Sequence, residues 1–434
     1  MRARCPGYAA LAACALAAGP ALGAEPAPAR VRAGGFAHLD WVVGRESSRD
    51  EIDPATGEPL NENRFVLTRA RARIEAERGA FGGRLELDAN TLRGPALRPF
   101  EANLWWRWPR GRPFSTPDTG LRGDVAAPEA GGEPPAMVMA TLGLFRVPFG
   151  FDTSEPATAR PWLERSTASR ALFAGARDLG VGVDAAWRFL RAAIALQNGE
   201  PLDAPGFGGR DPTRSKDLVG RVGVDVEVAP GVRARGGVSW LAGRGLSAGS
   251  PATKDTLNWV DGNENGLVET SELSVLPGAP ARPSRGFGRS ALGADLRLRV
   301  EVPSLGALVL RAEIVRAENL DRGLEPADPV AAGRDLREIG WQIGASQEVG
   351  PNVQIALRYD AYDPDADARR QAGVSIVPTD PLYATWALAV AARFEPVRLV
   401  WQYDHQRNPL GRAASGAPTT LRDDAVTLRG EVRF

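Results

Sequence analysis

The stretch FVLTRARARIEA, residues 65–76, alternates between small or apolar residues and charged residues. Successive side chains of an extended chain point to opposite faces, so this stretch predicts a strand with two contrasting faces. One predicted face carries Val66, Thr68, Ala70, Ala72, Ile74 and Ala76, and the other carries Arg69, Arg71, Arg73 and Glu75. Such a strand suits a wall with water on one side and an apolar medium on the other.

The same period of two recurs to the end of the chain. Sixteen candidate strands begin near residues 34, 63, 80, 98, 136, 178, 189, 216, 231, 286, 305, 335, 351, 382, 396 and 421. Strands of soluble sandwiches also alternate, so the pattern alone does not decide the fold. The length of these strands, about 10 to 14 residues, fits a tilted membrane span better than the usual strand of about 5 or 6.

The connections between these strands alternate in length. Short turns such as 78–80, 229–231 and 395–396 alternate with polar segments at 45–62, 110–135, 149–177, 199–215, 243–285, 319–334, 364–381 and 408–420. We expect the eight long segments to open on one side of a barrel, as external loops do, and the short turns to face the periplasm. The chain ends in a strand at Phe434, which we expect to pair with the first strand because a barrel has no free edge. The predicted fold is all-β, a transmembrane antiparallel up-and-down barrel of about sixteen strands formed by residues 25–434.

The N-terminus has the features of a secretion signal. Arg2 and Arg4 precede an apolar, alanine-rich run at 8–22, and small residues follow up to Ala24. We therefore predict a cleaved signal peptide over 1–24 and export to the bacterial outer membrane. The alternatives are a buried N-terminal helix and a lipid anchor at Cys14. Cys5 and Cys14 are the only cysteines, so the predicted barrel closes without disulfides.

Enzyme signatures are not found in the sequence. It contains 53 basic and 53 acidic residues and two histidines, His38 and His405, without acidic or cysteine neighbours at metal-ligand spacing. A phosphate-binding loop and a Gly-x-Ser-x-Gly elbow are both missing. We expect a protein without catalytic residues whose partners are outer-membrane lipid and small solutes, and not nucleic acid.

The arginines on the charged strand faces are the main functional candidates. Arg69, Arg71 and Arg73 follow one another about 7 Å apart, twice the strand rise, and Arg84 lies on the next predicted strand. Guanidinium groups stay charged and bind phosphate or carboxylate oxygens, so these four are predicted to line an anion path through the pore. The alternative is that they pair with Glu75, Glu86, Asp88 and Glu101 and only hydrate the wall.

A second motif lies in the longest loop. Residues 261–272, DGNENGLVETSE, match the twelve-residue calcium loop, with Gly266 at the sharp turn. The predicted ligands are Asp261, Asn263, Asn265, the carbonyl of Leu267, Glu269 through water and Glu272. The cofactor predicted from this match is Ca²⁺, and the alternative is an acidic loop that needs no ion.

Residues 144–199 resemble the phosphate-selective porin O and P family. The resemblance is carried by Leu144–Gly150 (LFRVPFG), the pair Glu164-Arg165, Ala176–Gly182 (ARDLGVG) and Gln197–Gly199 (QNG). It implies a sixteen-stranded barrel, often a homotrimer, that takes up phosphate or related anions through an arginine ladder joined by lysines. Arg69, Arg71 and Arg73 match part of that ladder, whereas only Lys216 and Lys254 are present as lysines.

These observations favour a porin, a water-filled channel that lets small solutes diffuse across the outer membrane with a preference for anions such as phosphate. Two other classes remain open at this point. One is an outer-membrane barrel with a non-channel role, such as an adhesin or a barrel enzyme. The other is a soluble periplasmic β-protein, which extraction without detergent would distinguish.

Overall fold

The computed structural model describes residues 28–44, 63–92, 94–108, 137–200, 211–372, 375–378, 382–412, 418–422 and 424–434. The predicted signal peptide at 1–24 lies outside them. Among the described residues, no helix combines the length and apolarity that a membrane crossing requires.

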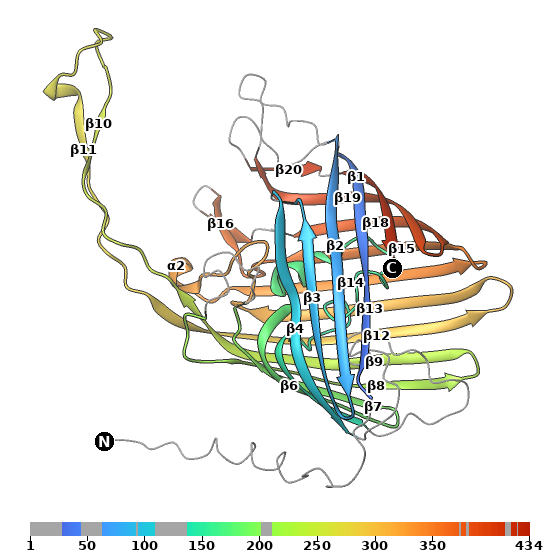
Figure 1. Cartoon of the computed structure of the whole chain (residues 1–434). Helices are drawn as coiled ribbons and strands as arrows, with labels where there is room; N and C mark the ends of the chain where they lie inside the picture. The colour runs from blue at the N-terminus through green and yellow to red at the C-terminus, as the bar shows by residue number, and fades with distance from the viewer. Residues whose placement is uncertain are drawn as a thin grey trace, which may run out of the picture.

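Sixteen long antiparallel strands form a closed barrel (Figure 1). They are β1 (Arg30–Gly44), β2 (Asn63–Arg78), β3 (Phe81–Asn90), β4 (Ala96–Trp108), β5 (Met137–Arg146), β6 (Arg177–Trp187), β7 (Leu190–Gln197), β8 (Asp217–Ala229), β9 (Val232–Ser247), β12 (Arg285–Val302), β13 (Gly306–Glu318), β14 (Arg337–Val349), β15 (Val353–Asp363), β18 (Tyr383–Phe394), β19 (Val397–Arg412) and β21 (Ala425–Arg433). The first and last strands pair, with Phe36 opposite Arg433, so the sheet has no free edge. The predicted fold class is confirmed.

Short elements occupy the connections. They are α1 (Thr167–Leu172), α2 (Pro329–Ala332), a 3₁₀ turn at Thr270–Glu272, the hairpin of β10 (Thr256–Trp259) with β11 (Leu273–Leu276), the hairpin of β16 (Arg369–Ala372) with β17 (Ser375–Pro378), and β20 (Pro418–Arg422), which pairs only with β19. The β10–β11 hairpin lies on an arm that projects from the barrel (Figure 1).

The two ends of the barrel differ. We call the turn end the one that holds 79–80, 188–189, 230–231, 303–305, 350–352 and 395–396, and the loop end the other. One prediction about these ends is wrong. The chain passes from β3 to β4 through 91–95 at the loop end, so β4 runs toward the turn end. The strand ends that 109–136 connects therefore lie at the turn end. For this reason not all eight long segments open to one side of the barrel. Residues 109–136 themselves lie outside the described residues.

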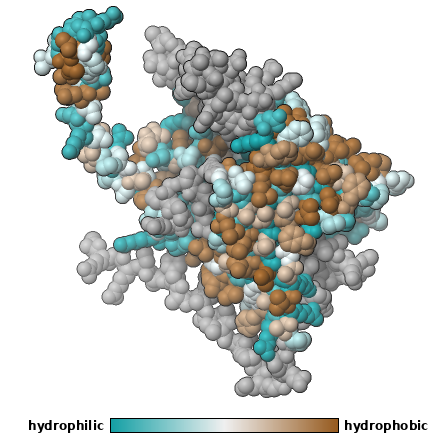
Figure 2. Space-filling model, turned by 45° about the horizontal axis from the view of Figure 1, so that its top comes forward, coloured by the Kyte–Doolittle hydropathy of each residue, from teal (hydrophilic) through white to brown (hydrophobic). Residues whose placement is uncertain are grey.

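The outer face of the barrel is apolar and the inner face is charged, as the alternation predicts. Ile74 is 55% exposed and Leu85 47% exposed on the outside, whereas Arg71 on the opposite face of β2 is 8% exposed. Exposed aromatic side chains lie toward both barrel ends, among them Trp41, Phe65, Trp341 and Trp386 toward the loop end and Phe81, Trp108, Trp187 and Phe394 toward the turn end. Figure 2 shows apolar residues gathered over the barrel wall. An apolar band with aromatic girdles is the surface that a lipid bilayer covers.

A β-bulge reverses part of the predicted pattern in β2. The register with β1 shifts between His38 and Leu39, so that Arg69 pairs with His38 and Leu67 with Leu39. The extra residue is Thr68, whose hydroxyl donates to the carbonyl of His38 at 3.3 Å. The assignment of Val66 and Thr68 to the lipid-facing side is therefore wrong: both are buried, because a bulge exchanges the two faces of a strand.

The connection between β5 and β6, residues 147–176, folds back into the barrel. We call it the inner loop. Phe149, Trp162, Ala171 and Leu172 are all at most 5% exposed, so the expectation that 149–177 forms an exposed loop is wrong. Figure 1 shows this segment, with α1, inside the ring of strands.

Glycines on the opposite wall make room for the inner loop. A Cβ atom at Gly293 would lie 2.8 Å from the ring of Phe149, and one at Gly344 would lie 2.6 Å from the ring of Trp162. Real Cβ atoms do not approach other atoms so closely. These glycines therefore form notches in β12 and β14 into which the two aromatic rings fit.

A second connection at the loop end completes the packing. The amide groups of Arg322 and Gly323 both donate to the carbonyl of Ala171, at 3.0 and 2.9 Å. Leu320 is 1% exposed in an apolar cluster with Phe149, Phe173 and the wall. The inner loop is thus held between the barrel wall and residues 319–336.

Candidate pore constriction and cationic basin

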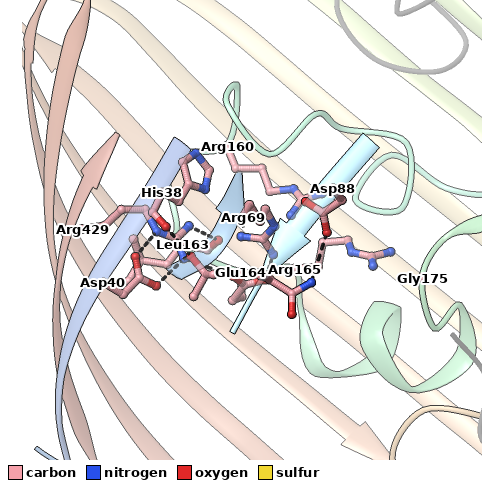
Figure 3. A network of polar contacts seen from close by, with 12 residues as sticks. His38, Asp40, Arg69, Asp88, Arg160, Leu163, Glu164, Arg165, Gly175 and Arg429 are labelled. Atoms are coloured by element: carbon pink, nitrogen blue, oxygen red, sulfur yellow. Dashed lines mark hydrogen bonds and ion pairs between the residues drawn. The ribbon is translucent and has the colours of Figure 1, made fainter. Parts of the chain in front are cut away.

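Glu164 of the inner loop binds arginines from two parts of the wall (Figure 3). Arg69 on β2 lies 2.5 Å from one carboxylate oxygen, and Arg429 on β21 lies 3.3 Å from the other. Arg429 also holds both oxygens of Asp40 at 2.7 Å. Burial alone would raise the pKa of Glu164, but the charges of Arg69 and Arg429 outweigh it and hold that pKa well below its ordinary value. The inner loop is therefore fixed to the wall through a charged carboxylate.

The neighbouring arginine of the inner loop is less constrained. Arg165 Nη1 donates only to the carbonyl of Phe173, at 3.4 Å, and no carboxylate of the described residues lies within ion-pair distance of it. Burial and the charge of Arg160 lower the pKa of Arg165 to about 9, so its guanidinium stays charged at neutral pH. Arg165 is therefore a charged side chain of the inner loop that keeps donors without a carboxylate partner among the described residues.

The four predicted pore arginines each lie within ion-pair distance of a carboxylate on the wall or the inner loop. Arg69 binds Glu164, Arg71 binds Asp88 at 2.9 Å, and Arg84 binds Glu101 at 2.9 Å as well as Glu75. This is largely the pairing with wall carboxylates that the alternative interpretation anticipates. The part that these residues play in an anion path stays a prediction.

Arg71 is also held by stacking. Its guanidinium carbon lies 3.2 Å from the centre of the Phe100 ring, and that of Arg177 lies 3.4 Å from the same centre. Two cations on one aromatic ring require nearby negative charge to remain together. Glu101 supplies it, because it accepts from Arg177 at 3.0 Å and from Arg84 at 2.9 Å.

We expect Glu101→Gln to destabilise the barrel by about 3 kcal/mol, because it leaves buried arginines without their shared counter-charge. The measurement is the midpoint of urea unfolding of the refolded protein in detergent micelles. Glu318→Gln, on an exposed carboxylate of β13, is the matched control and should leave the midpoint unchanged. Equal midpoints for both variants would show that the cluster around Glu101 does not stabilise the wall.

Between the inner loop and the turn end lies a cavity of about 630 Å³, which we call the cationic basin. Residues 156–159 of the inner loop line it on one side. Nine arginines and two glutamates line it: Arg71, Arg73, Arg146, Arg297, Arg299, Arg311, Arg393, Arg398, Arg433, Glu86 and Glu348. The basin therefore carries a marked excess of positive charge at its surface.

Several basin arginines are partly exposed to the cavity. Arg73, the fourth predicted pore residue, has 34% of its side chain exposed, and its contact with Glu75 is 3.9 Å long. Arg299 is 42% exposed and pairs with Glu301, which is 52% exposed. Arg393 has no carboxylate of the described residues within ion-pair distance. Arginine forks with spare donors bind oxyanions in a planar, two-point fashion.

The sequence pattern of a single strand could not identify most of the arginines that line the basin. Alternation places Arg297, Arg299, Arg398 and Arg433 on charged faces, but many other residues share that property. The available signal was position along the barrel axis: Arg297, Arg299 and Arg398 lie within about six residues of a short turn, and Arg433 lies one residue before the end of the chain. Counting residues from each short turn would have placed Arg297, Arg299 and Arg398 at the same level of the barrel as Arg393.

The predicted calcium residues lie together at the tip of the arm, and their oxygens bind the loop itself. Asp261 accepts from the amides of Asn265 and Gly266 at 3.1 and 2.7 Å. Glu272 accepts from Gly262 at 3.0 Å. Further hydrogen bonds of the predicted set include those of the Asn263 and Asn265 side chains with Glu269, and that of the amide of Leu267 with Asn265. Within the described ranges, no three His, Cys, Asp or Glu residues gather as a metal site. Calcium binding stays a prediction.

Known structures share this fold. The outer-membrane channel DcaP of Acinetobacter baumannii matches with a TM-score of 0.52 and 12% identity, covering 94% of this chain and 97% of its own. The anion-selective porin of Comamonas acidovorans matches with a TM-score of 0.52 and 11% identity, covering 94% and 100%. OmpT, an outer-membrane protein of Vibrio cholerae in its trimer form, gives 0.50 and 8%, covering 94% and 99%.

Sequence comparisons give no further assignment. No protein-family model matches the chain, and no curated protein matches it. Identities of 8 to 12% with the solved structures establish the fold alone. The barrel therefore has the same fold as these outer-membrane proteins, and the resemblance to phosphate-selective porins O and P stays a prediction.

Proposed function

We propose that this protein is an outer-membrane porin whose water-filled lumen passes small solutes and prefers anions, phosphate-like ones among them. The observation that carries the proposal is the cationic basin, where nine arginines face two glutamates in a cavity of about 630 Å³. A pore lined by one sign of charge concentrates the opposite ion and lowers its barrier to passage.

The rest of the barrel supports a membrane channel. Its apolar outer band with aromatic girdles suits outer-membrane lipid, and the turn end would face the periplasm, where short turns of such barrels lie. Arg165 on the inner loop would give an anion a charged contact before it reaches the basin. One structural neighbour is recorded as a trimer, and on that likeness we propose a homotrimer here.

Phosphate is the proposed preferred solute because a guanidinium presents two parallel N–H groups to two oxygens. Arg73, Arg299 and Arg393 line the basin without a lysine among the residues that surround it. Lysine is therefore not required for this proposal, since arginine can supply every charge of the path.

The test is conductance of the refolded protein in planar bilayers, with chloride as carrier and inorganic phosphate added stepwise. The proposal expects discrete channels whose chloride current falls as phosphate enters the same path. Chloride currents that stay unchanged as phosphate is added would remove phosphate as a preferred solute. A barrel that inserts and gives no channels would favour a non-channel role such as adhesion.

We also propose that the arm loop 261–272 takes up Ca²⁺ through the residues that the motif identifies. In isothermal titration of the full chain in detergent, added Ca²⁺ should release or absorb heat, and Glu272→Gln should weaken binding at least about tenfold because it removes the bidentate ligand. Glu264→Gln, at the fourth position of the motif, removes a charge but no ligand and is the matched control. The absence of any heat with the unaltered chain would retire the calcium proposal.

A further inference from the structure

We infer that the channel rectifies: it carries more current when anions move from the turn end to the loop end than when they move the opposite way. The inference rests on the proposed channel function and adds a direction to it. It follows from where the charges lie along the barrel axis, and not from their total.

Positive charge is concentrated on the turn-end side of the inner loop. Arg393, Arg398 and Arg433 lie within a few residues of the turn end on β18, β19 and β21, and the basin extends from there to residues 156–159. Arg297 and Arg299 enter it from the opposite wall on β12. Ions in this half of the lumen are therefore surrounded mainly by guanidinium groups.

Acidic groups bound only by neutral donors lie on the loop-end side. Asp321 accepts from the hydroxyl of Tyr362 at 2.6 Å, and Glu338 accepts from the amide of Leu320 at 2.8 Å. Others of this kind are Asp178, held by the amide of Leu179, Glu325, held by Tyr383, and Asp404, held by Gln402. In the part of the chain that the structure describes, no arginine or lysine lies within 4.0 Å of these five carboxylates. Asp178, Asp321 and Glu338 are at most 3% exposed, so the charge asymmetry along the barrel axis comes mainly from the arginines that line the basin at the turn end.

Two halves of different ion preference in series conduct unequally in the two directions. The basin carries current almost entirely by anions, whereas the loop-end half also carries cations. When anions move from the basin toward the loop end, anions arrive at the junction faster than they leave, and cations arrive from the other side. Salt accumulates and conductance rises. With the field reversed, both ions leave the junction and conductance falls.

The effect depends on how far the arginine charge reaches. A sphere of the basin's volume has a radius of about 5 Å. The screening length of about 10 Å at 0.1 M salt exceeds that radius, and the length of about 3 Å at 1 M does not. Rectification should therefore be present in dilute salt and disappear in concentrated salt.

The experiment records single-channel currents at +100 and −100 mV in symmetric 0.05 M and 1 M KCl. A biotin on Ser271→Cys in the arm marks the loop end, since streptavidin on that side alone binds it. We expect a current about twice as large when the loop end is positive in 0.05 M KCl, and equal currents in 1 M KCl. Arg393→Gln combined with Arg433→Gln should bring the dilute-salt ratio close to one, whereas Arg244→Gln, on the exposed outer face of β9, should leave it unchanged.

Each outcome decides between the two proposals. Channels with anion preference but equal currents in both directions at 0.05 M KCl overturn the directional inference and leave the porin function standing. A larger current when the loop end is negative also overturns the inference. A barrel that conducts no ions at all overturns the porin function itself.

Discussion

Replacing Arg73, Arg299 and Arg393 together by glutamine should lower the chloride-over-potassium permeability ratio by about threefold to tenfold. These three residues line the cationic basin and belong to its most open arginines. Their removal leaves Glu86 and Glu348 in place, so the surface loses positive charge without losing any negative charge.

The size of this effect follows from Coulomb's law. A charge about 8 Å from an ion in water contributes about 0.5 kcal/mol, so three contribute about 1.5 kcal/mol before screening. Salt at about 0.1 M reduces this to roughly half. About 0.7 kcal/mol changes anion entry about threefold, and the opposite change for cations raises the effect on the ratio to about tenfold.

The control for the triple variant is Arg244→Gln with Arg316→Gln, which removes exposed arginines from the outer faces of β9 and β13. Reversal potentials in a KCl gradient should shift for the basin variant and stay unchanged for the control. A shift of equal size in both variants would mean that the protein's overall charge, and not the basin, selects the ion.

Substituting Gly344→Leu should release the inner loop from the wall. A Cβ atom at this position would lie 2.6 Å from the ring of Trp162 and 3.2 Å from the carbonyl of Leu357. Overpacking of this kind costs about 1 to 3 kcal/mol, which lowers the ratio of docked to undocked loop about 5- to 150-fold. The expected result is a single-channel current that moves among several levels in place of one.

Gly288→Leu on β12 is the matched control, because a Cβ atom there has no neighbour within 4 Å. Its channels should keep a single level. A steady, unaltered current from Gly344→Leu would show that the inner loop does not narrow the conducting path, or that Trp162 does not hold it.

The strands could be predicted from the sequence because each carries its own evidence. The stretch at 65–76 shows its period of two without reference to any other residue, and β12 begins at Arg285, one residue before the predicted start. A β-bulge cannot be predicted in this way, because it depends on how two strands pair. Thr68 is inserted by the pairing of β2 with β1, and nothing in the sequence near Thr68 indicates it.

The position of the inner loop could not be predicted in the same way. Its residues show no alternation, and their burial depends on Gly293 and Gly344 in strands more than a hundred positions away. The basin could not be predicted for the same reason, because its residues come from strands far apart in the sequence. Arg73 and Arg393 face one cavity only because the last strand pairs with the first. The period of two shows which face of a strand a residue occupies, but not which residues of different strands lie at the same level along the barrel axis.

The most direct test of the account is the zero-current potential of the unaltered channel between 0.1 M and 0.01 M KCl. In this range the screening length is at least about 10 Å, so the basin arginines act across the lumen. If they select the ion, chloride crosses more readily than potassium and the concentrated side becomes positive. A concentrated side that is negative, or a potential of zero, would contradict the claim that a cationic basin inside an apolar-walled barrel determines what passes.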